Sequence, residues 1–200
     1  MTKTTQSFLD AAKIGDITSL KSYLASGISI NTTNRALQSA LLMAAMHQQY
    51  ETLQFLIENH ADIDQQDETC LNPFLYGCLN NDLTLVRIMI KAGADLTRLT
   101  RFGGVGLTPA AEKGYVEIVR ELLETTHINV NHTNFVGWTP LLEAIILNDG
   151  GATQQTIISL LLQHGANPNM TDKYGKSALE LASEKGYSEI VALLNKAIQD

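Results

Sequence analysis

The sequence repeats itself every 33 residues, and this period constrains the fold more than any other feature. The strings YLASGISIN (23–31), IENHADID (57–64) and IKAGADLT (90–97) share one pattern, in which an apolar stretch runs into a turn. Two columns step by the period: Gly27, His60 and Gly93 form one, and Gly15, Gln48, Asn81 and Gly114 form the other. A period of this length indicates stacked repeat units.

Each unit contains two helical stretches. The first is short and has alanine at its centre, as at Ala44 and Ala45, and small side chains let neighbouring helices approach closely. The second carries apolar residues at i, i+3 and i+4, as at Leu53, Leu56 and Ile57. One such pair cannot cover its apolar faces alone, so the units are expected to stack into a continuous core.

The pattern resembles that of the ankyrin-repeat family. GWTPLLEAI (137–145) and YGKSALELASEKGYSEIVALL (174–194) carry the family motif most clearly. The resemblance implies an all-α solenoid of six helix-pair units with short hairpin connections, forming a single domain over residues 1–200 with the first and last units as caps. The units start near Gln6, Ser39, Asn72, Val105, Thr139 and Ser177. A small stand-alone ankyrin-repeat protein is expected, with a bacterium as one candidate source.

The histidine of the family's Thr-Pro-Leu-His motif is absent from every unit. Its column reads Leu42, Leu75, Thr108, Leu142 and Glu180. The hydrogen bonding that this histidine provides in the family is therefore missing. We expect the first helices to begin with loose caps and to be held by apolar contact.

Composition excludes several functional classes. A net charge of −7 opposes a nucleic-acid or anionic-membrane partner, because both need clustered Lys and Arg. Two cysteines without metal-site spacing predict no disulfide framework and no bound metal, and they fit a reducing cytoplasm. The chain shows neither an apolar leader nor an apolar run of membrane-spanning length. We expect a cytoplasmic monomer without a cofactor.

The stretch RFGGVGLTP (101–109) departs from the repeat and allows two interpretations. In the first, Thr108 is the N-cap and Pro109 the first helical residue, so the fourth unit's first helix loses about one turn and the glycines lengthen the hairpin. In the second, the glycine amides and nearby arginines hold a small anion or nucleotide. The anion-binding residues would then be Arg98, Arg101, Gly103, Gly104 and Gly106.

The fifth unit is five residues longer than the period, and the excess lies in LNDGGATQQT (147–156), between its two helices. Gly150 and Gly151 after Asn-Asp predict a turn. Loop closure costs little more as a loop lengthens, so a tolerated insertion is favoured, and a functional role stays open.

No catalytic set is recognisable among the five histidines and two cysteines, and we expect no enzyme activity. The resemblance implies instead a partner protein, bound through the hairpin tips and the concave face of the first helices. The tip positions are the four residues after Asn34, Asp67, Thr100, Asn134 and Asp172. The helix-face pairs are Met46-His47, Leu79-Asn80, Glu112-Lys113, Ile146-Leu147 and Glu184-Lys185.

Aromatic residues concentrate on three adjacent tips, and aromatic and Arg side chains dominate binding energy at interfaces. The predicted partner-binding residues are Arg101, Phe102, Phe135, Val136, Trp138, Tyr174 and Lys176, with Trp138 at the centre. The alternative is that the rings only pack on neighbouring hairpins.

Overall fold

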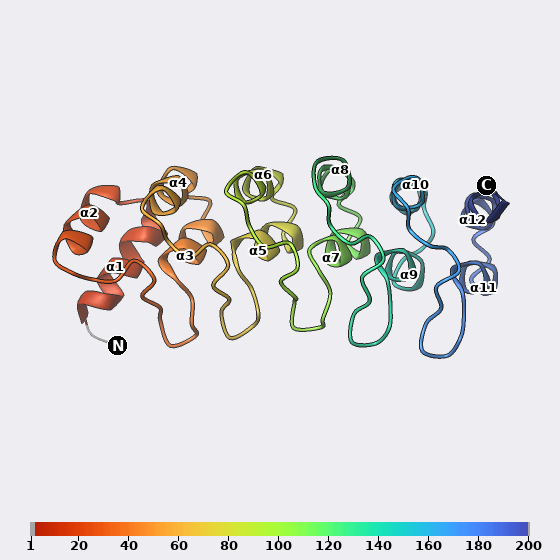
Figure 1. The fold of residues 1–200 in the computed structure, drawn as a ribbon, viewed down its shortest axis with the longest axis horizontal. Helices are drawn as coiled ribbons and strands as arrows, with labels where there is room; N and C mark the ends of the chain where they lie inside the picture. The colour runs from red at the N-terminus through yellow and green to blue at the C-terminus, as the bar shows by residue number, and fades with distance from the viewer. Residues whose placement is uncertain (1–2, 200) are drawn as a thin grey trace. The chain divides into compact units, whose positions relative to one another are not determined.

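The computed structural model describes residues 3–199, and over this range the chain forms twelve α-helices joined by turns and hairpins (Figure 1). The chain divides into two compact units, Met1–Arg98 and Leu99–Asp200. The first contains α1 (Lys3–Ile14), α2 (Ile17–Ala25), α3 (Ala40–Met46), α4 (Tyr50–Glu58), α5 (Pro73–Leu79) and α6 (Leu83–Lys91). The second contains α7 (Leu107–Glu112), α8 (Val116–Thr125), α9 (Pro140–Ile146), α10 (Ala152–Gln163), α11 (Ala178–Glu184) and α12 (Ser188–Gln199).

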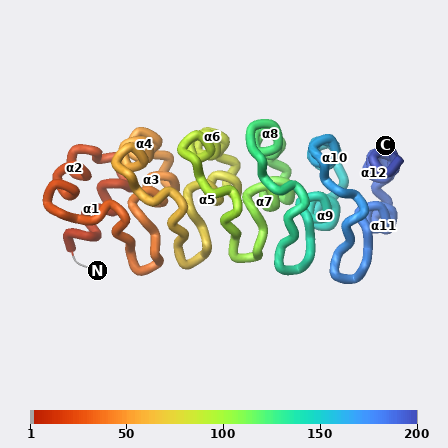
Figure 2. The backbone as a smooth tube through the Cα atoms, viewed as in Figure 1, coloured from red at the N-terminus to blue at the C-terminus, as the bar shows by residue number. Residues whose placement is uncertain are grey.

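The helices form six antiparallel pairs, as the sequence predicted. The first helix of each pair packs on the second, and a hairpin loop follows each pair except the last (Figure 2). In the first unit α3 packs between α1 and α5, and in the second unit α9 packs between α7 and α11. Alanines line these contacts: Ala12, Ala44, Ala45, Ala110, Ala111 and Ala182 are fully buried.

The first helices have stronger caps than we expected. Side-chain oxygens of Ser39, Asn72 and Thr139 accept hydrogen bonds from the backbone N–H three residues later, at 2.9–3.2 Å. Ser177 forms a full capping box with Glu180. A side-chain cap of this kind stabilises a helix by about 1 kcal/mol. The expectation of loose, apolar helix starts was therefore wrong, because Ser, Thr and Asn side chains provide the caps without the missing histidine.

The start of α7 also differs from the prediction. The helix begins at Leu107, one residue later than a step of 33 from Pro73, and it has six residues where α5 has seven. Thr108 lies inside the helix with its Oγ1 buried and unpartnered among the described residues, so it is not the N-cap. Pro109 is tolerated as the third helical residue because the first N–H groups of a helix lack intrahelical partners. The predicted loss of a whole turn was wrong.

The inserted residues of the fifth pair are structured. Part of the insertion extends α10, which has twelve residues where α8 has ten. The remaining turn packs under Tyr187, whose hydroxyl donates a hydrogen bond to the Asn148 carbonyl. Gly150 has φ +73°, and a Cβ at this position would lie 2.6 Å from the Tyr187 ring. The insertion is therefore a packed part of the second unit.

We expect Gly150→Ala to lower the free energy of unfolding by about 1–3 kcal/mol, because it adds a ring clash to the strain of a positive φ. Gly165→Ala is the matched control, since Gly165 has φ +87° and open space where a Cβ would lie. The control should cost only the backbone strain, about 1 kcal/mol. Urea unfolding measures both, and equal losses would contradict close packing of Tyr187 on the inserted turn.

Candidate functional site

A side-chain oxygen closes the tip of each hairpin. In four of the five hairpins, Oδ1 of an Asn or Asp accepts from the backbone N–H groups two and four residues later, at 2.8–3.1 Å. These closing residues are Asn34, Asp67, Asn134 and Asp172. In the remaining hairpin, the third along the chain, Thr100 Oγ1 accepts from Gly104 alone, at 3.2 Å. Because the closure in the Asn134 and Asp172 hairpins reaches only backbone N–H groups, the tip side chains of these two hairpins are left to project outward.

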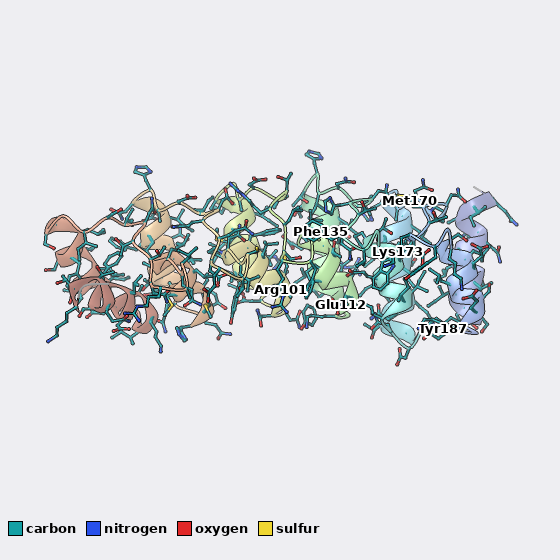
Figure 3. All side chains as sticks on the ribbon, turned by 90° about the horizontal axis from the view of Figure 1, so that it is seen from below. Arg101, Glu112, Phe135, Met170, Lys173 and Tyr187 are labelled. Atoms are coloured by element: carbon teal, nitrogen blue, oxygen red, sulfur yellow. The ribbon has the colours of Figure 1, made fainter. Side chains whose placement is uncertain are left out.

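Three aromatic rings project from consecutive hairpins of the second unit. Phe102 is 65% exposed, Phe135 is 74% exposed and Tyr174 is 75% exposed, and Val136 beside Phe135 is 40% exposed. Figure 3 views the molecule from the side toward which the hairpins project in Figure 1. Exposure of this extent contradicts the alternative in which these three rings serve only to pack on their neighbours.

The first two of these tips are connected to each other. The Phe135 N–H donates to the Phe102 carbonyl at 3.0 Å. The Phe135 ring also covers Gly103, where a Cβ would lie 2.5 Å from the ring. His132 Nε2 lies 2.7 Å from the Gly103 carbonyl oxygen. These contacts fix one face of Phe135 and leave the other open to solvent.

Two cations lie on the aromatic rings. The Arg101 guanidinium carbon is 4.7 Å from the Phe102 ring centroid, and Lys173 Nζ is 5.1 Å from that of Tyr174. Lys176 behaves differently, because its Nζ contacts both carboxylate oxygens of Glu184 at 2.6 and 2.7 Å. This hydrogen bond raises the pKa of Lys176 above its usual value. Lys176 is therefore paired below the tip that carries Tyr174.

Trp138, which the sequence predicted as the centre of the site, is half-buried at the base of its hairpin. Its backbone N–H donates to Asn134 Oδ1 at 2.9 Å, which holds it at the base of the hairpin. Its indole Nε1 is buried and has no hydrogen-bond partner within residues 3–199. The ring is less accessible than those of Phe102, Phe135 and Tyr174.

The glycine-rich stretch does not form an anion cradle. Gly103, Gly104 and Gly106 are buried. The N–H of Gly103 donates to the Thr100 carbonyl and that of Gly104 to Thr100 Oγ1, so both amides are occupied. Arg98 Nε pairs with Asp95 Oδ2 of its own hairpin at 3.2 Å. Nothing in this geometry favours the anion-binding alternative.

The predicted helix-face pairs lie at the C-terminal ends of α3, α5, α7, α9 and α11. Their first members are half-buried, apart from the exposed Glu184, and their second members are exposed. This face contains a residue that the sequence interpretation missed, Glu143 of α9, which is 7% exposed. A carboxylate among the apolar residues of PLLEAII was the available signal.

Burial raises the pKa of Glu143 to about 7, and the nearby Glu112 carboxylate adds to the increase. A hydrogen bond from Asn134 Nδ2 to Glu143 Oε1 acts in the opposite direction. Asn134 therefore connects the hairpin that carries Phe135 to Glu143. Among the described residues, Glu143 is the only carboxyl group with a large shift in pKa.

Glu143 predicts a pH-dependent stability. Between the ordinary carboxyl pKa of 4.5 and the folded value of about 7, the folded protein keeps a proton that the unfolded chain has released. The free energy of unfolding therefore falls as the pH rises through this window. We expect Glu143→Gln, which keeps an acceptor for Asn134, to be more stable than the wild type by about 1–3 kcal/mol at pH 8 and to match it near pH 4.

Urea unfolding from pH 4 to 8 measures this effect, with Glu117→Gln of α8 as the control, since Glu117 is exposed. The control should stay within about 0.5 kcal/mol of the wild type at every pH. If the free energy of unfolding of Glu143→Gln changes with pH in parallel with that of the wild type, Glu143 is not the titrating group.

The described residues contain no group of three or more His, Cys, Asp or Glu side chains that could hold a metal ion. Within the same range, every helix is too short or too polar to cross a membrane. Cys70 and Cys78 are free thiols, and burial raises the pKa of the Cys78 thiol far above its usual value. Cys78 is accordingly a core residue and a poor nucleophile.

Comparison with known proteins gives consistent likenesses. Residues 8–100, 74–172 and 107–200 match the family model described as ankyrin repeats in three copies. The chain is 60% identical over 187 residues to YahD of Escherichia coli K12, which is named as an ankyrin repeat protein, and the match covers 94% of this chain and 93% of YahD. Both likenesses extend over most of the sequence.

Solved structures agree with this result. An ankyrin repeat domain from Acinetobacter baumannii superposes with a TM-score of 0.89 at 40% identity, covering 95% of this chain and 96% of that one. The ankyrin repeat protein EF0377 superposes with a TM-score of 0.86 at 32% identity, covering 94% of this chain and 96% of its own. These likenesses confirm the predicted fold class, the all-α repeat solenoid.

Proposed function

Because the chain belongs to the ankyrin-repeat family, whose repeats generally mediate protein–protein interaction, we propose that it binds a partner protein through the hairpin tips of its second unit. The binding surface, called here the tip surface, consists of Arg101, Phe102, Phe135, Val136, Lys173 and Tyr174. The protein acts by occupying or presenting its partner and performs no reaction of its own.

One observation carries the proposal, the exposure of three aromatic rings on three consecutive hairpins. Large rings in water are unfavourable unless a partner covers them, and aromatic and Arg side chains provide most of the binding energy at protein interfaces. Three rings on adjacent tips offer one continuous surface to a single partner. Scattered apolar residues would not support the same conclusion.

The backbone under the tip surface supports tight binding because it is already ordered. Asn134 and Asp172 fix two of the tips, and the Phe135–Phe102 backbone bond joins two of them. A preorganised surface loses less conformational entropy on binding. In this proposal Trp138 and Lys176 support the tips from below, and Trp138 is no longer the centre of the contact.

We place this function in the cytoplasm and assign it to the monomer. The free thiols of Cys70 and Cys78 are the state that a reducing compartment maintains.

Phe135→Ala should weaken partner binding by about 2 kcal/mol, as expected for an aromatic residue that a partner buries. Its free energy of unfolding should change by less, because most of the ring is exposed. The measurement is the amount of each protein captured from a bacterial lysate, quantified by mass spectrometry, together with the urea midpoint of each variant.

Leu37→Ala is the matched control, since Leu37 is a 51% exposed tip residue of the first unit. It should capture the same proteins as the wild type. Trp138→Ala separates support from contact, because it should lower the urea midpoint as well as the capture. Unchanged capture by Phe135→Ala and Tyr174→Ala would remove the tips from the site and favour the helix-face pairs.

A further inference from the structure

The hairpins of the second unit differ in charge from the protein as a whole. The chain has a net charge of −7, yet its segments 99–106, 126–139 and 164–177 contain three Lys or Arg residues and a single carboxylate. That carboxylate, Asp172, is 8% exposed, and its Oδ1 accepts from the N–H groups of Tyr174 and Lys176. The exposed charge on these tips is therefore positive.

Two of the three cations are available to a partner. Arg101 and Lys173 are exposed and lie over the rings of Phe102 and Tyr174, and within residues 3–199 neither contacts a carboxylate. Lys176 is already paired with Glu184. The two available cations flank the tip surface, one on its first hairpin and one on its last, with Phe135 and Val136 on the hairpin between them.

Resting on the proposed function, we infer that the tip surface binds an extended protein segment that is both acidic and apolar. Its carboxylates lie opposite Arg101 and Lys173, and its apolar side chains cover Phe102, Phe135 and Tyr174. Charge complementarity favours a carboxylate near each end of the bound segment. Each carboxylate can then pair with one cation while the rings stay in contact with the apolar side chains between them.

The hairpin spacing sets the spacing of the carboxylates. Neighbouring packed helices lie about 8–10 Å apart, and an extended chain advances about 3.3 Å per residue. Adjacent tips are thus about three residues apart along an extended segment. The two carboxylates are expected about six residues apart, with apolar residues between them.

Nucleic acid and anionic lipid fit the surface less well. Binding to either depends on many Lys and Arg contacts that release counterions or approach a charged surface. Here two cations are available on a protein of net charge −7, beside the exposed apolar side chains of Phe102, Phe135, Val136 and Tyr174. A protein segment with two carboxylates and apolar residues can pair with the two cations and also cover the exposed apolar side chains.

The test selects peptides of about twelve residues from a random displayed library on the immobilised full chain. Enriched sequences should carry two Asp or Glu residues about six positions apart with apolar residues between them. Synthetic peptides of these sequences should bind in fluorescence anisotropy about tenfold more weakly to Arg101→Glu/Lys173→Glu. Lys21→Glu is the matched control, because Lys21 Nζ also lies over a ring, that of Phe55, outside both the tip surface and the helix-face pairs. It should change the affinity less than twofold.

Selection on the double variant should enrich Lys and Arg at the same two positions. Two results would overturn the inference and leave the proposed function in place. The enriched peptides could lack paired carboxylates, or the selected peptides could bind Arg101→Glu/Lys173→Glu with the same affinity as the wild type. Stronger binding of an oligothymidine or of phosphatidylserine vesicles than of any selected peptide would also overturn it. Peptides that bind Phe135→Ala as well as the wild type would contradict the proposed function itself.

Discussion

One hydrogen-bonding arrangement determines the shape of the hairpin tips. In four of the five hairpins a single Asn or Asp side-chain oxygen accepts two backbone N–H groups at the tip, and the backbone N–H of the same residue donates to the carbonyl four residues later. The turn is thereby closed by atoms that lie behind the tip. In the hairpins of Asn134 and Asp172 the closing hydrogen bonds reach backbone N–H groups, so the rings of Phe135 and Tyr174 between them are left to project outward.

The third hairpin, which Thr100 closes, shows what happens when this arrangement is weakened. Thr100 has one hydroxyl oxygen where the other hairpins have Asn or Asp, and it accepts only the Gly104 amide. Gly103 adopts φ +82°, and the missing side chain leaves room for the Phe135 ring of the next hairpin. The glycines that suggested a phosphate loop are therefore explained by closure and packing. A ring of the neighbouring hairpin covers the weaker tip, and the two tips become one surface.

The sequence predicted the features that the period controls and missed those that depend on tertiary contact. Six helix pairs and the alanine contacts follow from spacing alone. The residue types of Ser39 and Asn72 are enough to predict helix N-caps. We did not predict them, because the expectation of loose caps rested on the missing histidine alone. The start of α7 and the order of the inserted turn depend on Gly106 geometry and on Tyr187, which is distant in sequence. The burial of Glu143 and the half-burial of Trp138 likewise required three-dimensional packing, because the sequence pattern places a residue on a face and does not say what covers it.

Asn134 connects the two unusual features of the second unit. Its Oδ1 closes the hairpin that carries Phe135, and its Nδ2 donates to Glu143, the carboxyl group whose pKa is raised to about 7. A buried carboxylate without a cationic partner is costly, and in either protonation state Glu143 can accept from Asn134. The amide stays oriented with its oxygen toward the turn, because the opposite orientation would point its NH2 group at the N–H groups of Val136 and Trp138. Glu143 thus contacts the residue that closes the hairpin carrying Phe135, and one side chain, Asn134, joins the buried acid to the central ring of the tip surface.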